Sequence, residues 1–223
     1  DGYDIIFKDA HGNRLDHEIE EYDETTDNRL IAWVRIPTLY YNRDTVIYMY
    51  YGNPAVDAET QNPAGVWDNN FNAVWHLHDD FLDSTSNPND GTNSGSTDTA
   101  AKIADGQDFD GVDDYVDLGS DASIDNFFAG GATIEAWIRP DTWGEQGVGR
   151  IVDKGDSYGW AFEVDDNTGA NDSLRFVHLR ETLTGRWNTP DLSITLGDWH
   201  HVVLTYDQDS TATDPAIYID GQS

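Results

Sequence analysis

The amino-acid sequence predicts an all-β protein made of two β-sandwich units, and three observations support this prediction. Nearly every ordered stretch is rich in β-branched and aromatic residues and is bounded by turn-forming residues. Hydrophobic residues make up 38% of the 223 residues, with 8 Trp, 11 Tyr and 8 Phe, which is too many for a disordered acidic chain. Only residues 62–75 could hold a helical turn. We therefore expect strands throughout and very little helix.

The first predicted unit covers residues 1–72. Residues 29–37 (RLIAWVRIP) and 44–52 (DTVIYMYYG) have the composition of strands. Residues 53–72 hold two Asn-Pro pairs and few strand-forming residues, which is typical of a loop or linker. A length of 223 residues allows one large domain or two modest ones. We therefore place the domain boundary near residue 72.

The second predicted unit covers residues 73–223. Residues 133–140 (TIEAWIRP) alternate, so that Ile134, Ala136 and Ile138 should share one strand face. Residues 159–164 and 173–180 should pair as a hairpin, and further strands are expected at 200–207 and 216–221. Three tryptophans lie in strand patterns and are expected in the core: Trp137, Trp160 and Trp199.

The last predicted strand ends in a turn signal. Asp220 and Gly221 follow an alternating strand, and Asp-Gly is a favoured two-residue hairpin turn. A hairpin requires a returning strand, and an unpaired last strand would be an aggregation-prone edge. We therefore expect the returning strand to come from outside this sequence, either from a longer polypeptide or from another chain.

The net charge of −31 sets strong limits on the partners of this protein. The chain has 34 Asp against 9 Glu, and 9 Arg against 3 Lys. Repulsion among so many negative charges destabilises a compact state. Salt screens this repulsion, since the Debye length falls to about 3 Å near 1 M salt. The bias predicts a salt-loving or marine source, and a calcium-loaded extracellular protein is the alternative. Nucleic acid is excluded as a partner because no basic patch is present to meet phosphates.

Two other absences narrow the class of protein. There is no cysteine, so the chain has no disulfide, no thiol chemistry and no cysteine-based metal site. No apolar run in this sequence approaches the ~18 residues of a membrane span, so no membrane span is predicted in it.

Several motifs in residues 73–223 occur in the order of one known family. They are AVWHLHDDFLDSTSNPNDGT (73–92), GQDFDGVDDYVDLG (106–119), TIEAWIRP (133–140), LGDWHHVVLTYD (196–207) and IYIDGQ (217–222). This part of the chain resembles the laminin-G-like, concanavalin A-like jelly roll in its bacterial and archaeal form. The resemblance implies a jelly-roll sandwich whose closing strands lie outside this sequence.

The first unit carries a second resemblance. Its matching pieces are residues 3–23, AWVRIP (32–37), DTVIYMYYGNP (44–54) and AGVWDNNFNAVWHL (64–77). These resemble a domain family of unknown function, marked by MYYGNP, that is often found just before such jelly rolls. The resemblance implies a β-sandwich in a surface protein, with its opening strand outside this sequence. It implies no activity.

An acidic stretch, FDGVDDYVDLG (109–119), is the strongest candidate metal site. Asp110, Asp113 and Asp114 lie in a tight turn around Gly111, so their oxygens can converge. Calcium takes six to eight oxygen ligands, mostly from loops, and jelly rolls of this type commonly hold a structural calcium. A second loop, DSTSNPND, could add Asp83, Asn87 and Asp90. The alternative is a solvated acidic surface, because some of 34 aspartates must cluster by chance.

Two loop tryptophans, Trp143 and Trp187, are candidate ligand platforms because sugars bind apolar ring faces. The alternative for both is a hydrophobic plug that covers the core. His76 and His78 share one side if their stretch is a strand, and could ligate zinc, although the resemblance favours a structural His76. His200 and His201 point to opposite strand faces, so one of them should be a buried, hydrogen-bonded residue.

An enzymatic function has little support in the sequence. The concanavalin A shape also carries glucan-cleaving enzymes, whose carboxylates come from Glu-x-Asp-x-x-Glu on one strand. Retaining glycosidases need two carboxyls about 5–5.5 Å apart. No such spacing occurs here, since Glu135 is followed two and five residues on by Trp137 and Pro140, and no Gly-x-Ser-x-Gly elbow of a serine hydrolase is present. We therefore expect no enzyme.

The interpretation from sequence is a non-catalytic, extracellular surface module with calcium-stabilised loops. It would bind a glycan or another cell-surface ligand as part of a larger adhesin, appendage or virion protein. Its partners would be that glycan or cell-surface protein, together with neighbouring chains or further domains of the same polypeptide. The alternative is a purely structural β-sandwich spacer in a cell-surface or viral assembly.

Overall fold

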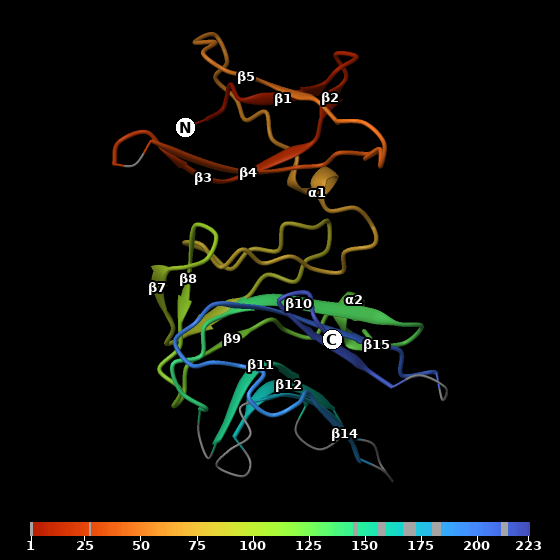
Figure 1. Cartoon of the computed structure of the whole chain (residues 1–223). Coiled ribbons are helices and arrows are strands. Elements are labelled where there is room, and N and C mark those ends of the chain that lie inside the picture. Colours follow the sequence, from red (N-terminus) through yellow and green to blue (C-terminus); the bar gives the residue numbers. More distant parts are fainter. Residues whose placement is uncertain are drawn as a thin grey trace. The chain divides into compact units, whose positions relative to one another are not determined.

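A computed structural model describes residues 2–26, 28–144, 147–155, 159–166, 173–179, 184–210 and 214–223. The regular secondary structure of the described residues is almost entirely β, with two helices of one turn each, α1 (Pro63–Val66) and α2 (Ala122–Asp125) (Figure 1). The predicted all-β class is therefore confirmed. No helix among the described residues is long and apolar enough to cross a membrane.

The chain forms two compact units. The first contains residues 1–108 and 115–125, and the second contains residues 109–114 and 126–223. The chain thus passes from one unit to the other three times. The boundary near residue 72 stays a prediction.

Two small sheets form the sandwich of the first unit (Figure 1). One has the order β2-β1-β5, from β1 (Ile6–Asp9), β2 (Arg14–Leu15) and β5 (Ile47–Tyr50). The other pairs β3 (His17–Asp23) with β4 (Arg29–Val34). The core between them contains Ile5, Phe7 and Leu15, against which Ile19, Leu30, Ala32, Val34 and Ile47 pack. The predicted strand at 29–37 contains β4, which ends at Val34, and the predicted strand at 44–52 contains β5.

An aspartate organises the turn between β1 and β2. The Asp9 carboxylate accepts hydrogen bonds of 2.8 Å from the side chain of Asn13 and from the backbone N–H groups of His11 and Asn13. The side-chain hydrogen bond from Asn13 lowers the pKa of Asp9 below its ordinary value. Gly12 has a φ of +86°, which permits the tight return of the chain.

The first unit also contains four short strands. These are β6 (Thr92–Ser94), β7 (Thr97–Ala100), β8 (Asp105–Asp108) and β9 (Tyr115–Asp117), paired as β6-β9 and β7-β8. The stretch around His76 and His78, expected as a strand, forms none, because Leu77 and Asp79 have φ values of +59° and +55°. Left-handed backbone at both residues breaks the alternation on which a shared side depends.

Two larger sheets form the sandwich of the second unit. One has the order β10-β15-β16, from β10 (Ala132–Ile138), β15 (His200–Tyr206) and β16 (Ala216–Ile219). The other has the order β11-β12-β13-β14, from β11 (Val148–Lys154), β12 (Trp160–Asp165), β13 (Ser173–Leu179) and β14 (Thr184–Asn188). The core contains Phe128, Phe162, Val164, Leu174, Phe176, Ile194, Val202, Leu204 and Tyr206.

The predicted alternation of β10 is confirmed, but Trp137 does not lie in the core. Ile134, Ala136 and Ile138 pack against the core, whereas the outward-facing Trp137 is 40% exposed. Strand geometry places it on the opposite face, where its ring lies 5.1 Å from that of His201. The predicted hairpin of β12 and β13 is also confirmed.

The Asp-Gly turn after β16 is formed as predicted. Asp220 and Gly221 both have positive φ, +50° and +77°, as a type I′ turn requires. Ile219 and Gln222 exchange backbone hydrogen bonds of 2.8 and 2.9 Å across this turn. The Asp220 carboxylate accepts 2.9 Å hydrogen bonds from His200 Nδ1 and from the backbone N–H of His201. His200 is therefore the buried, hydrogen-bonded member of the histidine pair.

Candidate functional site

The acidic loop at residues 109–114 folds into a compact turn. Asp110 Oδ1 accepts hydrogen bonds from the backbone N–H groups of Val112 (2.8 Å) and Asp113 (3.3 Å). Asp114 Oδ2 accepts one from the backbone N–H of Asp110 (2.9 Å). Gly111 has a φ of +73°, which lets the chain reverse within four residues. The three carboxylates consequently face a common point.

This turn can present oxygen ligands to a cation. One carboxylate oxygen from each of Asp110, Asp113 and Asp114 lies within 4.8 Å of the others, and no other such group occurs among the described residues. Three like charges this close repel one another, by about 1 kcal/mol per pair even in bulk water. A divalent cation between the carboxylates would replace this repulsion with attraction. The loop offers three of the six to eight oxygens that calcium takes, so solvent or further groups must supply the remainder. The donor set therefore fits calcium chemically.

The second predicted loop is organised by its own hydrogen bonds. Asp83 Oδ1 accepts from the backbone N–H groups of Val74 (3.1 Å) and Thr85 (3.0 Å), and Asp90 Oδ1 accepts from that of Asp83 (2.9 Å). The Asn87 side chain donates to the backbone carbonyl of Asn72 (2.8 Å). These residues belong to the first unit, whereas the acidic loop belongs to the second. A joint site of the two loops stays a prediction.

The two candidate platform tryptophans are partly buried against the core of the second unit. The Trp187 ring stacks on Phe176, with centroids 5.8 Å apart and an interplanar angle of 23°. Its indole N–H donates to Asp214 Oδ1 at 3.1 Å. Packing of this kind supports the alternative of a plug over the core. A ligand-binding role for Trp143 and Trp187 stays a prediction.

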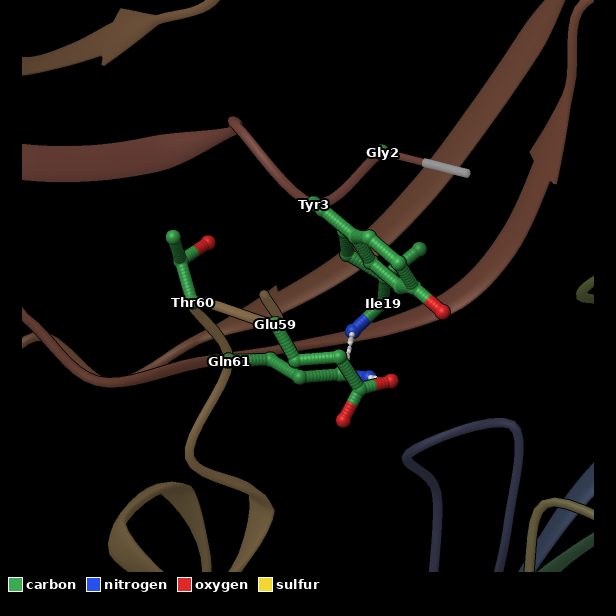
Figure 2. A pocket seen from close by; sticks show the side chains of 6 residues that line it. All are labelled: Gly2, Tyr3, Ile19, Glu59, Thr60 and Gln61. Atoms are coloured by element: carbon green, nitrogen blue, oxygen red, sulfur yellow. Dashed lines mark hydrogen bonds between the residues drawn. The ribbon is translucent and has the colours of Figure 1, made fainter. Parts of the chain in front are cut away.

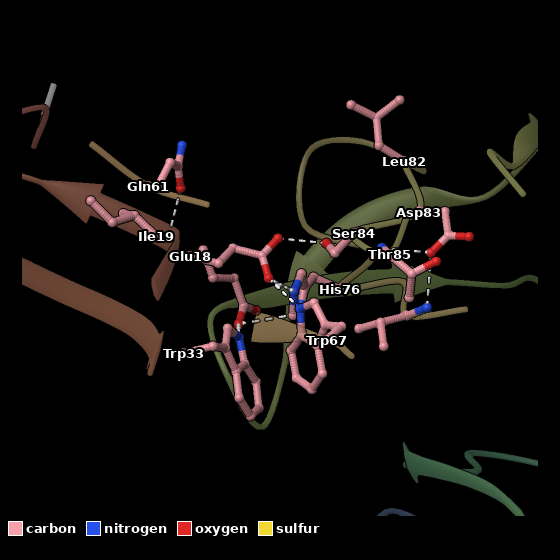
Figure 3. A network of polar contacts seen from close by, with 12 residues as sticks. Glu18, Ile19, Trp33, Gln61, Trp67, His76, Leu82, Asp83, Ser84 and Thr85 are labelled. Atoms are coloured by element: carbon pink, nitrogen blue, oxygen red, sulfur yellow. Dashed lines mark hydrogen bonds and ion pairs between the residues drawn. The ribbon is translucent and has the colours of Figure 1, made fainter. Parts of the chain in front are cut away.

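A buried polar network in the first unit was not found by sequence reasoning (Figure 3). Glu18 Oε2 accepts hydrogen bonds from Trp67 Nε1 (2.5 Å) and His76 Nε2 (3.1 Å), while Ser84 Oγ donates to Glu18 Oε1. His76 Nδ1 also lies 3.5 Å from Glu20 Oε2. Trp33 donates to the same Glu20 oxygen, and its ring stacks on the His76 ring at 5.4 Å.

The environment shifts the pKa values of this network in opposite directions. Burial alone would lower the pKa of His76, but the hydrogen bond and charge of Glu18, with the charges of Glu20 and Asp80, raise it above its ordinary value. Burial alone would raise the pKa of Glu18, but hydrogen bonds from His76, Ser84 and Trp67 lower it. The contacts therefore favour an ion pair between an imidazolium and a carboxylate. They make a structural role for His76 more consistent than zinc ligation.

A second buried cluster lies on β12 and β13. Arg175 Nε donates to Glu163 Oε1 at 2.5 Å, and Arg175 Nη1 lies 2.6 Å from Asp165 Oδ2. All three side chains are at most 8% exposed. Glu163 and Asp165 repeat the Glu-x-Asp start of the glucanase motif, but residue 168 is threonine where that motif has its second glutamate. Arg175 engages both carboxylates, which opposes their use as a free acid and base.

Two small hollows flank residues 59–62 in the first unit. The hollow in Figure 2 has a volume of about 110 Å³ and is lined by Gly2, Tyr3, Ile19, Glu59, Thr60 and Gln61. The other has about 360 Å³ and is lined by Arg14, Leu15, Asp16, Glu59, Thr60, Gln61 and Asn62. Small-molecule sites are usually about 300–1,000 Å³ and mostly apolar. The first hollow is too small and the second too polar to replace the acidic loop as the candidate site.

Comparison with protein families agrees with the architecture of the second unit. The model of the concanavalin A-like lectin/glucanases superfamily, in its laminin-G form, matches residues 110–223, just over half of the chain. The chain therefore belongs to this superfamily. The matched region begins at Asp110, so it includes the three aspartates of the acidic loop.

The remaining comparisons concern the first unit and the whole chain. A domain of unknown function, DUF2341, matches residues 1–94. No curated protein and no solved structure matches the chain. Both resemblances seen in the sequence are thereby confirmed.

Proposed function

We propose that this protein is a non-catalytic, extracellular surface module that binds a glycan or another cell-surface ligand as part of a larger adhesin, appendage or virion protein. The main observation in support of this proposal is a concanavalin A-like sandwich with three converging carboxylates in one of its loops. Domains of this type generally act as binding modules. The charge of −31 favours a neutral or cationic ligand surface over an anionic one.

Calcium would have a structural role in this proposal. Asp110, Asp113 and Asp114 would hold the ion, and its charge would offset their mutual repulsion and fix the turn around Gly111. A fixed loop loses less conformational entropy when a ligand binds, so affinity should depend on the ion even where the ligand does not touch it.

The absence of catalysis is supported by the arrangement of the carboxylates. The Glu163 and Asp165 pair is occupied by Arg175, and the Glu18 carboxylate is occupied by His76, Trp67 and Ser84. A glycosidase needs one protonated and one ionised carboxyl beside an open substrate site. Neither cluster offers that combination.

The structural-spacer alternative is supported by the packing of Trp143 and Trp187 against the core. If these rings serve only to close the sandwich, the second unit loses its two candidate sugar platforms. Two β-sandwiches without a ligand would then act as building blocks of a surface assembly.

The test is a glycan array read with calcium and with a chelator, together with calorimetric titration of calcium into chelator-treated protein. We expect millimolar or tighter calcium binding, lost in the Asp113→Asn/Asp114→Asn variant and retained in a control Asp44→Asn/Asp57→Asn variant, which removes two exposed carboxylates elsewhere. Glycan binding that falls with the chelator supports the module. Calcium binding without any glycan binding supports the spacer, and no calcium binding returns the loop to a solvated surface.

A further inference from the structure

Large apolar side chains are exposed along residues 39–51, which form β5 and the loop before it. Their exposed fractions range from 46% to 101%: Leu39, Tyr40, Tyr41, Val46, Tyr48, Met49, Tyr50 and Tyr51. We call this group the β5 edge patch. Single exposed apolar residues are common on protein surfaces, but their concentration in one segment indicates a surface used for interactions.

The position of β5 in its sheet explains what the patch could bind. The sheet order is β2-β1-β5, and among the described strands β5 pairs only with β1. A strand at the edge of a sheet has N–H and C=O groups directed away from its one neighbour. The backbone of residues 47–50 is therefore a template for a further strand.

Side chains on β5 are more exposed than the core-facing side chain beside them on β1, which indicates a missing neighbouring strand. Met49 is opposite Phe7 in the register, so both side chains share the core face of the sheet. Phe7 is only 7% exposed, whereas Met49, one strand further out, is 46% exposed. On the other face, Tyr48 and Tyr50 are each 50% exposed, and Lys8 Nζ lies 5.2 Å from the Tyr50 ring centroid. A strand beside β5 would cover apolar surface on both faces.

We propose that the β5 edge binds an extended segment of a partner protein, which adds a fourth strand to the β2-β1-β5 sheet. The backbone of the segment would pair with that of residues 47–50. Apolar side chains at alternate positions would cover Met49, and the side chains between them would lie along Tyr48 and Tyr50. This interaction is separate from the proposed ligand binding of the second unit.

Charge decides between the possible occupants. Two copies of a chain with a net charge of −31 repel each other, which disfavours pairing of one β5 with another at physiological salt. Two cations near the patch are already engaged by aromatic rings: Lys8 with Tyr50, and Arg43, 3.7 Å above the Tyr40 ring centroid. Both side chains keep their charge in these contacts, but an acidic segment would still be repelled by the overall charge of −31. The occupant that fits is a neutral or basic strand with alternating apolar residues.

The probe is a fluorescein-labelled peptide, Thr-Val-Lys-Val-Thr-Ile-Lys-Val, titrated with the intact protein and followed by fluorescence anisotropy at 0.15 M salt, roughly physiological strength. The control peptide has the same charge but carries proline at its central valine, which removes a donor and breaks strand pairing. We expect saturable binding of the probe, and we expect the control to bind about tenfold more weakly, a difference in binding free energy of about 1.4 kcal/mol. Equal binding of the two peptides would mean charge attraction alone and would overturn the proposal.

Protein variants locate the site. Met49→Lys should weaken binding about tenfold, whereas Leu82→Lys, at a loop residue that is 57% exposed, should leave it unchanged. Because Met49→Lys could also perturb folding, hydrogen exchange of the unmodified protein provides a second measurement. Peptide binding should slow exchange of those amides of residues 47–50 that point away from β1, and leave the amides of residues 105–108 unchanged. Binding without protection at 47–50, or a protein that already dimerises through this edge, would refute a partner strand there.

Discussion

Removal of the Arg175 guanidinium should strongly destabilise the second unit. Its contacts to Glu163 and Asp165 are 2.5 and 2.6 Å long, and the three side chains are 8%, 5% and 3% exposed. Arg175→Met keeps much of the side-chain volume but leaves two buried carboxylates without their cation. Breaking a buried pair in this way costs about 3–5 kcal/mol, because the remaining charge stays desolvated.

A matched control comes from the surface of the same sheet. Arg150 lies 3.1 Å from Asp153, but these side chains are 67% and 48% exposed. Exposed pairs contribute about 0.2–1 kcal/mol, so Arg150→Met should have a small effect. The two substitutions remove the same charge from the same sheet and differ mainly in burial.

Urea denaturation followed by tryptophan fluorescence measures the difference, since Trp160 and Trp187 pack against the core of this unit. We expect Arg175→Met to lower the free energy of unfolding by about 3–5 kcal/mol, which in a thermal melt of the same variant corresponds to a drop of about 6–20 °C in melting temperature. The triple variant Glu163→Gln/Asp165→Asn/Arg175→Met should recover part of the loss, because no unpaired charge remains. A loss for Arg175→Met within about 1 kcal/mol of that for Arg150→Met would refute the reasoning.

Three further predictions concern pH and salt. Burial lowers the pKa of His17, which is fully buried beside Phe7, so its contribution to stability should be complete above about pH 6.5 and fall as the pH drops below that value. His17→Phe should reduce this loss of stability at low pH. An unchanged dependence of stability on pH would contradict the burial argument. The pH dependence expected from His76 is the opposite: its raised pKa gives stability that is present below about pH 6.5 and is lost as the pH rises through the folded-state pKa. His76→Gln should therefore remove this fall in melting temperature between pH 6 and 9. A fall that persists in the variant would argue against the ion pair with Glu18. The charge of −31 should make the protein melt at a lower temperature in dilute buffer without divalent ions than in molar salt. A comparison of sodium sulfate with sodium chloride separates charge screening from the general stabilisation by excluded salts. Equal melting temperatures in dilute buffer and in molar salt would contradict a salt-adapted surface.

The sequence predicted the elements whose signals are local. The alternation of β10, the hairpin of β12 and β13, and the Asp220–Gly221 turn each depend on neighbouring residues, and all three were found. Trp137 shows where this reasoning failed: its position in a strand pattern suggested the core, but the alternation of that strand places it on the outer face.

The buried networks were beyond prediction because their partners are far apart in sequence. Glu18 and His76 are separated by 58 residues, and nothing in either local pattern indicates the other. The β-bulge between Ile19 and Glu21 also changes the strand register where Glu20 lies, which no periodicity rule anticipates. The acidic loop was predictable because Asp110, Asp113 and Asp114 are within five residues and Gly111 marks the turn.

The threefold passage of the chain between its units has a practical consequence for taking the protein apart. Residues 109–114 belong to the second unit, but residues 115–125 return to the first. A protease that cuts once at any bond from 108 to 126 cannot release two intact units, because one product always carries residues of the other unit or lacks residues of its own. A shortened chain that begins at residue 126 would lack the acidic loop altogether. Expression of the two parts as fragments divided at a single bond in this region should therefore leave at least one unit incomplete.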